Sequence, residues 1–190
     1  MHIEEGWIGS WSPGIGDPTP IGWLTVGFYI LAAWLCHRVL RSERARLIAL
    51  DPMERRLWRL LVLTLVFLGI NKQLDLQSAM TEIGIMLAKQ QGWYAMRGTV
   101  QVWFIALLGL AVVVTIMVTT YLLRRTPMAT RIALSGSIVL MGFVLVRAAS
   151  FHRVDAFLLS TIGGMRMNWI LEVGGLIVIS MGARKRAQIR

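Results

Sequence analysis

The sequence predicts an all-α integral membrane protein with five transmembrane helices. Of the 190 residues, 56% are apolar and only 16% are charged, whereas about a quarter of the residues are charged in an ordinary soluble domain. The mean hydropathy is +0.62. Five apolar segments approach the roughly 20 residues that a helix needs to cross the hydrocarbon layer. These segments are residues 21–37, 57–77, 100–123, 132–151 and 162–182.

The distribution of basic residues predicts the orientation. Fourteen of the 20 Lys and Arg residues follow the first, third or fifth segment, so the positive-inside rule places the N-terminus outside and the C-terminus in the cytoplasm. This topology suits a multi-pass protein of the bacterial cytoplasmic (inner) membrane. The net charge of +10 would otherwise suggest a nucleic-acid partner, but no recognisable binding module surrounds the arginines. We therefore expect membrane lipids, not nucleic acid, as their partners.

Residues 1–20 are predicted to form an outer loop. Gly, Pro and Asp occur at turn-favouring spacings in GWIGSWSPGIGDPTPIGW, and the tryptophans suit the membrane interface. The loop either anchors the chain there or folds as a lid over an outer cavity. Because the first apolar segment starts late, without a basic region or cleavage site before it, we expect no signal peptide.

The second helix is expected to begin in the cytoplasm, since Asp51 can cap it and Pro52 suits its first position. After it, Met80, Ile83 and Met86 follow helical spacing. This pattern predicts an outer amphipathic helical segment, either lying on the surface or continuing the second helix. The third apolar segment is conventional, and no internal repeat divides the chain. Residues 1–190 are therefore expected to form a single membrane domain.

Ionisable side chains interrupt three of the five segments. With a rise of 1.5 Å per residue, Lys72, Asp75 and Arg147 lie about 20–25 Å from the cytoplasmic ends of their helices, and Glu172 lies near the middle of its helix. A lone charge at the bilayer centre costs roughly 3 kcal/mol or more. We therefore expect Lys72 and Arg147 to pair with Asp75 and Glu172 around a polar cavity that opens outward.

The chemistry of this cluster favours an enzyme that acts on a lipid-linked or amphiphilic anionic substrate. His152 would act as general base, with carboxylates as acid or orienting groups, and the basic residues would hold an anionic head group. The predicted catalytic residues are His152, Asp155, Asp75 and Glu172. The predicted substrate-binding residues are Asn71, Lys72, Gln73, Arg147, Arg153 and Asn168.

A metal site is not predicted, although His152 and the three carboxylates could ligate zinc, because only one histidine lies near the cluster. No cofactor is indicated, and the single cysteine, Cys36, excludes an internal disulfide. Other functions stay open. The alternatives are charges that only hold the helices together, a non-catalytic subunit of a larger complex with a membrane-protein partner, and a proton-coupled or small-molecule transporter that uses Glu172 and Asp75.

Overall fold

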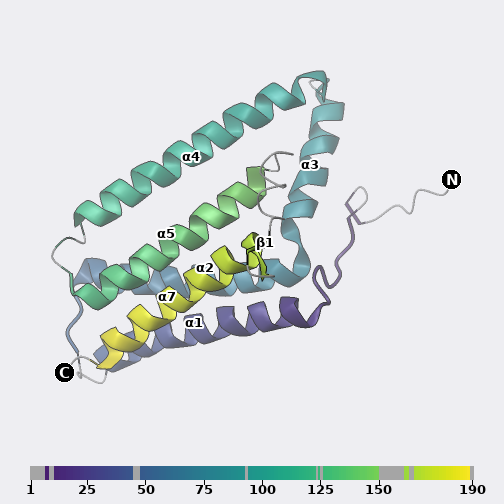
Figure 1. The fold of residues 1–190 in the computed structure, drawn as a ribbon. Coiled ribbons are helices and arrows are strands. Elements are labelled where there is room, and N and C mark those ends of the chain that lie inside the picture. The colour runs from purple at the N-terminus through teal and green to yellow at the C-terminus, as the bar shows by residue number, and fades with distance from the viewer. Residues whose placement is uncertain are drawn as a thin grey trace.

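A computed structural model describes residues 7–8, 11–44, 48–92, 94–122, 124, 126–149, 161–162 and 165–188. The fold is helical, with one short antiparallel strand pair (Figure 1). Its elements are α1 (Pro20–Arg44), α2 (Pro52–Leu74), α3 (Leu76–Gln90), η1 (Tyr94–Met96), α4 (Arg97–Leu122), α5 (Met128–Ala149), β1 (Thr161–Ile162), β2 (Met165–Arg166) and α7 (Met167–Gln188). Within this part of the chain, three stretches are long and apolar enough to cross a membrane: α1, α2 and residues Met128–Leu145 of α5.

Four helices form a bundle. Helix α1 packs against α2 and α7, and α7 packs against α5, whereas α3 leads away from the bundle and α4 returns along its outside, near α5 (Figure 1). The interior is apolar, with Val39, Leu65, Leu140, Leu176 and Ile179 almost fully buried. Burial of these side chains fixes which face each helix turns inward.

Helix α2 begins as expected but ends earlier than the sequence predicts. The Asp51 side chain accepts a hydrogen bond from the Met53 amide at 3.0 Å, with Pro52 at the first helical position. At the other end Asp75 adopts a left-handed conformation, with φ 46° and ψ 48°, which stops the helix. The expectation of one continuous helix over 57–77 is therefore wrong at its outer end. The amphipathic segment that follows is a separate helix, α3.

The fifth apolar segment also begins later than predicted. Residues 161 and 162 pair with 166 and 165 in the strand ladder, so their backbone groups are engaged outside a helix. Helix α7 starts only at Met167. Glu172 consequently lies about 8 Å from the beginning of α7, not near the middle of this helix.

Candidate functional site

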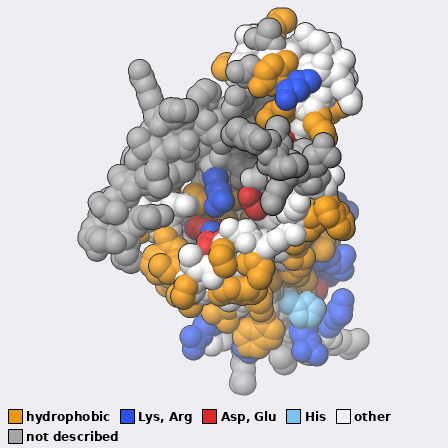
Figure 2. Space-filling view, turned by 90° about the vertical axis from the view of Figure 1, so that its right-hand side faces the viewer, with side chains coloured by type: hydrophobic (Ala, Val, Ile, Leu, Met, Phe, Trp, Pro, Cys, Tyr) orange, Lys and Arg blue, Asp and Glu red, His pale blue; other side chains and the backbone are white. Residues whose placement is uncertain are grey.

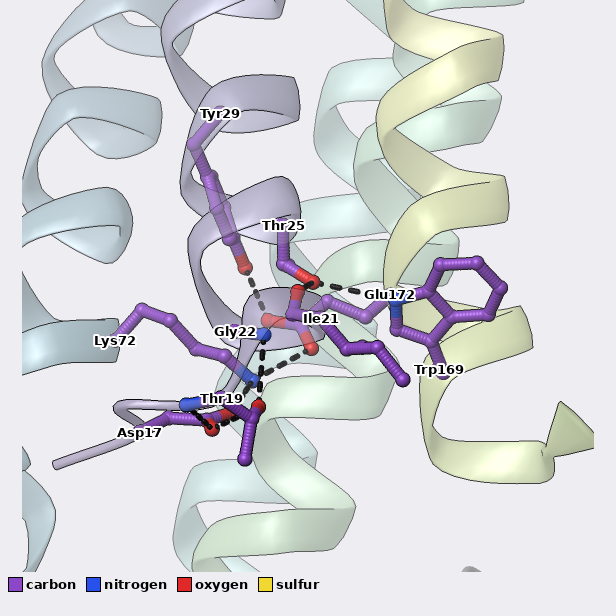
Figure 3. Close-up of polar contacts among 9 residues, drawn as sticks. All are labelled: Asp17, Thr19, Ile21, Gly22, Thr25, Tyr29, Lys72, Trp169 and Glu172. Carbon is purple, nitrogen blue, oxygen red and sulfur yellow. Dashed lines mark hydrogen bonds and ion pairs between the residues drawn. The ribbon is translucent and has the colours of Figure 1, made fainter.

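A buried carboxylate links three helices near the end of the bundle where α1 and α7 begin and α2 ends (Figure 3). The sequence predicts that this end faces outward, and it is called the outer end. Tyr29 of α1 donates its hydroxyl to Glu172 Oε1 at 3.1 Å, and Lys72 Nζ of α2 donates to Glu172 Oε2 at 3.1 Å. Glu172, on α7, is only 3% exposed. Each carboxylate oxygen thus has a donor from a different helix, and the Lys72 ammonium supplies the opposite charge that such burial requires.

Close packing of α1 against α2 positions these donors. Gly69 lies directly against Tyr29, where a β-carbon would come within 3.1 Å of the Tyr29 Cβ. One turn before Tyr29, the buried Thr25 hydroxyl donates to the Ile21 carbonyl and accepts from Trp169 Nε1 at 3.2 Å. These contacts attach the beginning of α7 to α1, so that Glu172, one turn beyond Trp169, faces Tyr29.

The segment before α1 lies over the outer end of α2. The Gly16 amide donates to the Gln73 carbonyl, and a β-carbon at Gly16 would come within 2.9 Å of the Asp75 Cβ. Asp17 Oδ2 lies 3.7 Å from Lys72 Nζ. The Lys72 ammonium therefore contacts two carboxylates, that of Glu172 inside the bundle and that of Asp17 at the end of the bundle.

A small cavity of about 30 Å³ lies beside these side chains, enough for one or two water molecules. It is lined by Leu68, Phe143 and Val144 together with six polar or ionisable residues. The polar lining residues are Tyr29, Asn71, Lys72, Asp75, Arg147 and Glu172. Figure 2, which views the molecule from the right-hand side of Figure 1, shows acidic and basic side chains next to one another in the middle of this face.

Five of the candidate residues from the sequence thus line one cavity, and the Lys72–Glu172 pair forms as expected. Asp75 was expected to pair with a basic residue. Its carboxylate instead accepts a hydrogen bond from the Ser78 hydroxyl at 2.6 Å. Gln73 faces a groove between α1 and α2 instead of this cavity. Among the described side chains, both polar atoms of the Gln73 amide and Oδ1 of Asn168 are buried without a hydrogen-bond partner. His152, Arg153 and Asp155 lie outside the described residues.

Sequence reasoning missed Tyr29 and Asp17. Tyr29 stands one turn after Thr25 in an otherwise apolar segment, and this i, i+4 pair of hydroxyls was a usable signal of a polar face. Asp17 looked like an ordinary turn residue. Only the path of the chain before α1, which cannot be read from local sequence, brings it to Lys72.

A second buried ionic cluster closes the opposite end of the bundle. Glu54 accepts hydrogen bonds from Trp58, from Thr130 and from both Nε and Nη2 of Arg186, at 2.8 and 3.2 Å for the arginine. Arg186 Nη2 also donates to the Ala49 carbonyl at 2.6 Å. Glu54 and Arg186 are 2% and 5% exposed. This inner cluster joins α2, α5 and α7, and the Glu54 carboxylate is saturated with donors.

The sequence did not single out this inner cluster. Glu54 lies in the first turn of α2, where acidic residues are common, and Arg186 is one of several basic residues near the end of α7. Within the part of the chain that the structure describes, no three His, Cys, Asp or Glu side chains gather closely enough to hold a metal ion.

Acid is expected to release the segment before α1 from the mouth of the cavity. The hydrogen bond from the Thr19 hydroxyl, together with the Lys72 charge, holds the pKa of Asp17 below its ordinary value of 3.8 despite some desolvation. Because the folded pKa is the lower one, the Asp17 contacts stabilise the fold fully above pH 3.8 and lose this contribution as the pH falls through the folded value.

The measurement is the mobility of a spin label attached at Ile15→Cys, in a Cys36→Ala background, between pH 6 and pH 2.5. Mobility should rise only at the acidic end, and Asp17→Asn should show the mobile spectrum at every pH. An immobile label in Asp17→Asn would contradict the assignment.

No family model, curated protein or solved structure matches the chain. Its function is therefore argued from the geometry of the two ionic clusters.

Proposed function

We propose that the chain is a five-span protein of the bacterial cytoplasmic membrane, with its N-terminus outside. We further propose that it is an enzyme acting on an amphiphilic anionic substrate from the outer leaflet. Helices α4 and α7, of 26 and 22 residues, are the additional spans. Both exceed the length that the hydrocarbon layer requires, and the resulting odd number of spans agrees with the asymmetric distribution of basic residues.

The contrast between the two ionic clusters carries the functional part of the proposal. Both contain a buried glutamate, a cation and a hydroxyl donor from three helices. In the inner cluster Glu54 accepts hydrogen bonds from four donor groups. Arg186 also donates to the Ala49 carbonyl, and this complete pairing suits a purely structural role. The outer cluster borders a water-sized cavity, and two amides on the same helices, Gln73 next to Lys72 in sequence and Asn168 one turn before Glu172, have unpartnered polar atoms. Incompletely satisfied buried polar groups are costly for stability, and a binding function explains their retention.

The proposed chemistry is proton transfer at the head group. Glu172 accepts or donates the proton, Tyr29 orients its carboxylate, and the Lys72 ammonium is paired with that carboxylate before the substrate enters. Lys72 and Arg147 attract the anionic group of the substrate. The cavity of about 30 Å³ is too small for a head group, so Gly16 and Asp17 must move aside first. His152, Asp155 and Arg153 remain predicted members of the same site.

Transport is less well supported. Between the outer and inner clusters, the described interior consists of apolar side chains, among them Leu61, Leu65, Leu140, Leu176 and Ile179. A proton or solute path needs a succession of polar groups across the membrane, and the described side chains of this layer do not form one. A non-catalytic subunit of a larger complex is the remaining alternative, and the experiment below separates it from an enzyme.

The test compares removal of the outer ion pair with removal of the inner one. Purified wild type, Glu172→Gln/Lys72→Met and Glu54→Gln/Arg186→Met would each be incubated in nanodiscs made from a bacterial polar lipid extract. Lipids would then be analysed by mass spectrometry, with the folded fraction measured by thermal unfolding. Wild type and the inner double variant are expected to convert a lipid species. The outer double variant should lose at least about 100-fold in rate, the usual scale of acid–base catalysis.

The outcome decides between the candidate functions. If wild type leaves every lipid unchanged, the enzyme proposal is wrong, and a stoichiometric protein co-purifying with wild type would identify an accessory subunit instead. If both double variants lose conversion equally per folded molecule, the outer cluster has no special role.

A further inference from the structure

We propose that the groove between α1 and α2 is a binding site for one anionic phospholipid, whose phosphate lies at Arg44 and Arg59. In the proposed orientation this lipid belongs to the cytoplasmic leaflet. The site is separate from the outer cluster, and it does not depend on the enzymatic assignment.

The groove has two connected parts. An apolar part of about 720 Å³ runs along α1 and α2 and is lined by Ile30, Ala33 and Val66, among others. A smaller part of about 330 Å³ continues the groove toward the cytoplasmic end of the two helices. His37 and Val62 line both parts. The depression is therefore continuous from the apolar middle of the two helices to their basic ends.

Small residues deepen the apolar part. Ala33 and Gly69 line the groove and are buried, whereas Ile30, Trp34 and Val66 at its sides are half exposed or more. From Arg44 to Ile30 the groove extends along α1 for about 21 Å, at 1.5 Å per residue. This length accommodates an extended acyl chain, which would be held in the groove by van der Waals packing.

The cytoplasmic end carries a net positive charge. It is lined by His37, Glu43, Arg44 and Arg59. Glu43 is already paired with Arg55, whose Nε and Nη2 lie 2.6 and 2.5 Å from Glu43 Oε1. The acid at this end is thus neutralised by a residue outside the groove lining, and Arg44 and Arg59 supply an uncompensated charge. A basic end joined to an apolar channel one acyl chain long complements a phosphate with an attached tail, which is why we assign an anionic phospholipid.

The experiment measures lipid retention by native mass spectrometry. Wild type in nanodiscs of equimolar phosphatidylglycerol and phosphatidylcholine would be transferred to a mild detergent, and the bound lipids counted. Wild type is expected to retain one phosphatidylglycerol. Arg44→Ala/Arg59→Ala should lower this affinity on the order of 30-fold, since each basic residue near a membrane surface contributes about one kcal/mol.

Two further variants separate a defined site from general attraction. Arg41→Ala/Arg56→Ala removes the same charge from exposed positions of the same helices outside the groove, and should retain the lipid. Val66→Trp fills the apolar part without changing any charge, and should reduce retention. The proposal is overturned if both arginine double variants lose the lipid equally, if Val66→Trp retains it fully, or if wild type retains phosphatidylcholine equally well.

Discussion

Arg186→Met is expected to destabilise the protein by roughly 3–5 kcal/mol, the usual cost of leaving one partner of a buried ion pair uncompensated. The variant removes the donor of three hydrogen bonds, two to Glu54 and one to the Ala49 carbonyl. Glu54 would then remain buried in contact with Thr130 and Trp58 without an opposite charge. The loss should be measured as a change in the free energy of unfolding in a denaturing detergent titration at constant pH.

The neighbouring Lys185→Met is the matched control, because Lys185 is exposed on the same turn of α7 and surface charges contribute little to stability. The double variant Glu54→Gln/Arg186→Met should recover most of the loss, since replacing a buried ion pair as a whole is often close to neutral. If Arg186→Met proves as stable as Lys185→Met, the inner cluster does not hold the bundle together.

The second large effect is expected where α5 and α7 touch through their backbones. A β-carbon at Gly136 would lie 2.7 Å from the Ile179 amide nitrogen and 2.8 Å from the Gly175 carbonyl oxygen. At Gly182 it would lie 2.5 Å from the amide nitrogen of Ala133. Because the obstructing atoms are backbone, the helices must separate. Gly136→Ala and Gly182→Ala should each destabilise by about 1–3 kcal/mol, the usual cost of overpacking.

Two other glycines of the same helices provide the control. A β-carbon at Gly142 of α5 or at Gly174 of α7 meets no atom within 4 Å among the described residues. Gly142→Ala and Gly174→Ala should therefore be neutral, or stabilising by up to about 1 kcal/mol through helix propensity. Thermal unfolding of all four variants in one detergent tests the contrast. Equal stability of the four would show that the α5–α7 contact is looser than described.

The sequence identified the helical elements well in their apolar middles and poorly at their ends; α1, for example, continues to Arg44, beyond the predicted end at residue 37. Apolar length alone indicates a helix, because the bilayer offers the backbone no other hydrogen-bond partner. The ends depend on local backbone conformation. Asp75 stops α2 by adopting a left-handed conformation, and residues 161–166 pair as strands before α7 begins. Apolarity reports neither feature, so both predicted boundaries at 77 and 162 were wrong.

The sequence predicted which charged residues belong to the candidate site better than it predicted which of them pair with one another. The cost of placing an ion in hydrocarbon required Lys72 and Glu172 to find opposite charges, and the structure pairs them across 100 residues of sequence. The same argument named Asp75 as the second acid and did not consider Asp17, which is the acid that lies near Lys72. Which acid lies there depends on the path of the chain before α1, and Asp75 is instead engaged with Ser78.

The sequence by itself determined that this chain is a helical membrane protein with charges that must compensate one another, because hydrophobicity and the cost of burying ions are properties of residues and their spacing. Only the tertiary structure decided that the charges divide into two clusters, one saturated and one beside a water-sized cavity. Helix rotation and the close approach of α5 to α7 set which side chains meet, and these follow from packing among all four helices of the bundle rather than from any one segment.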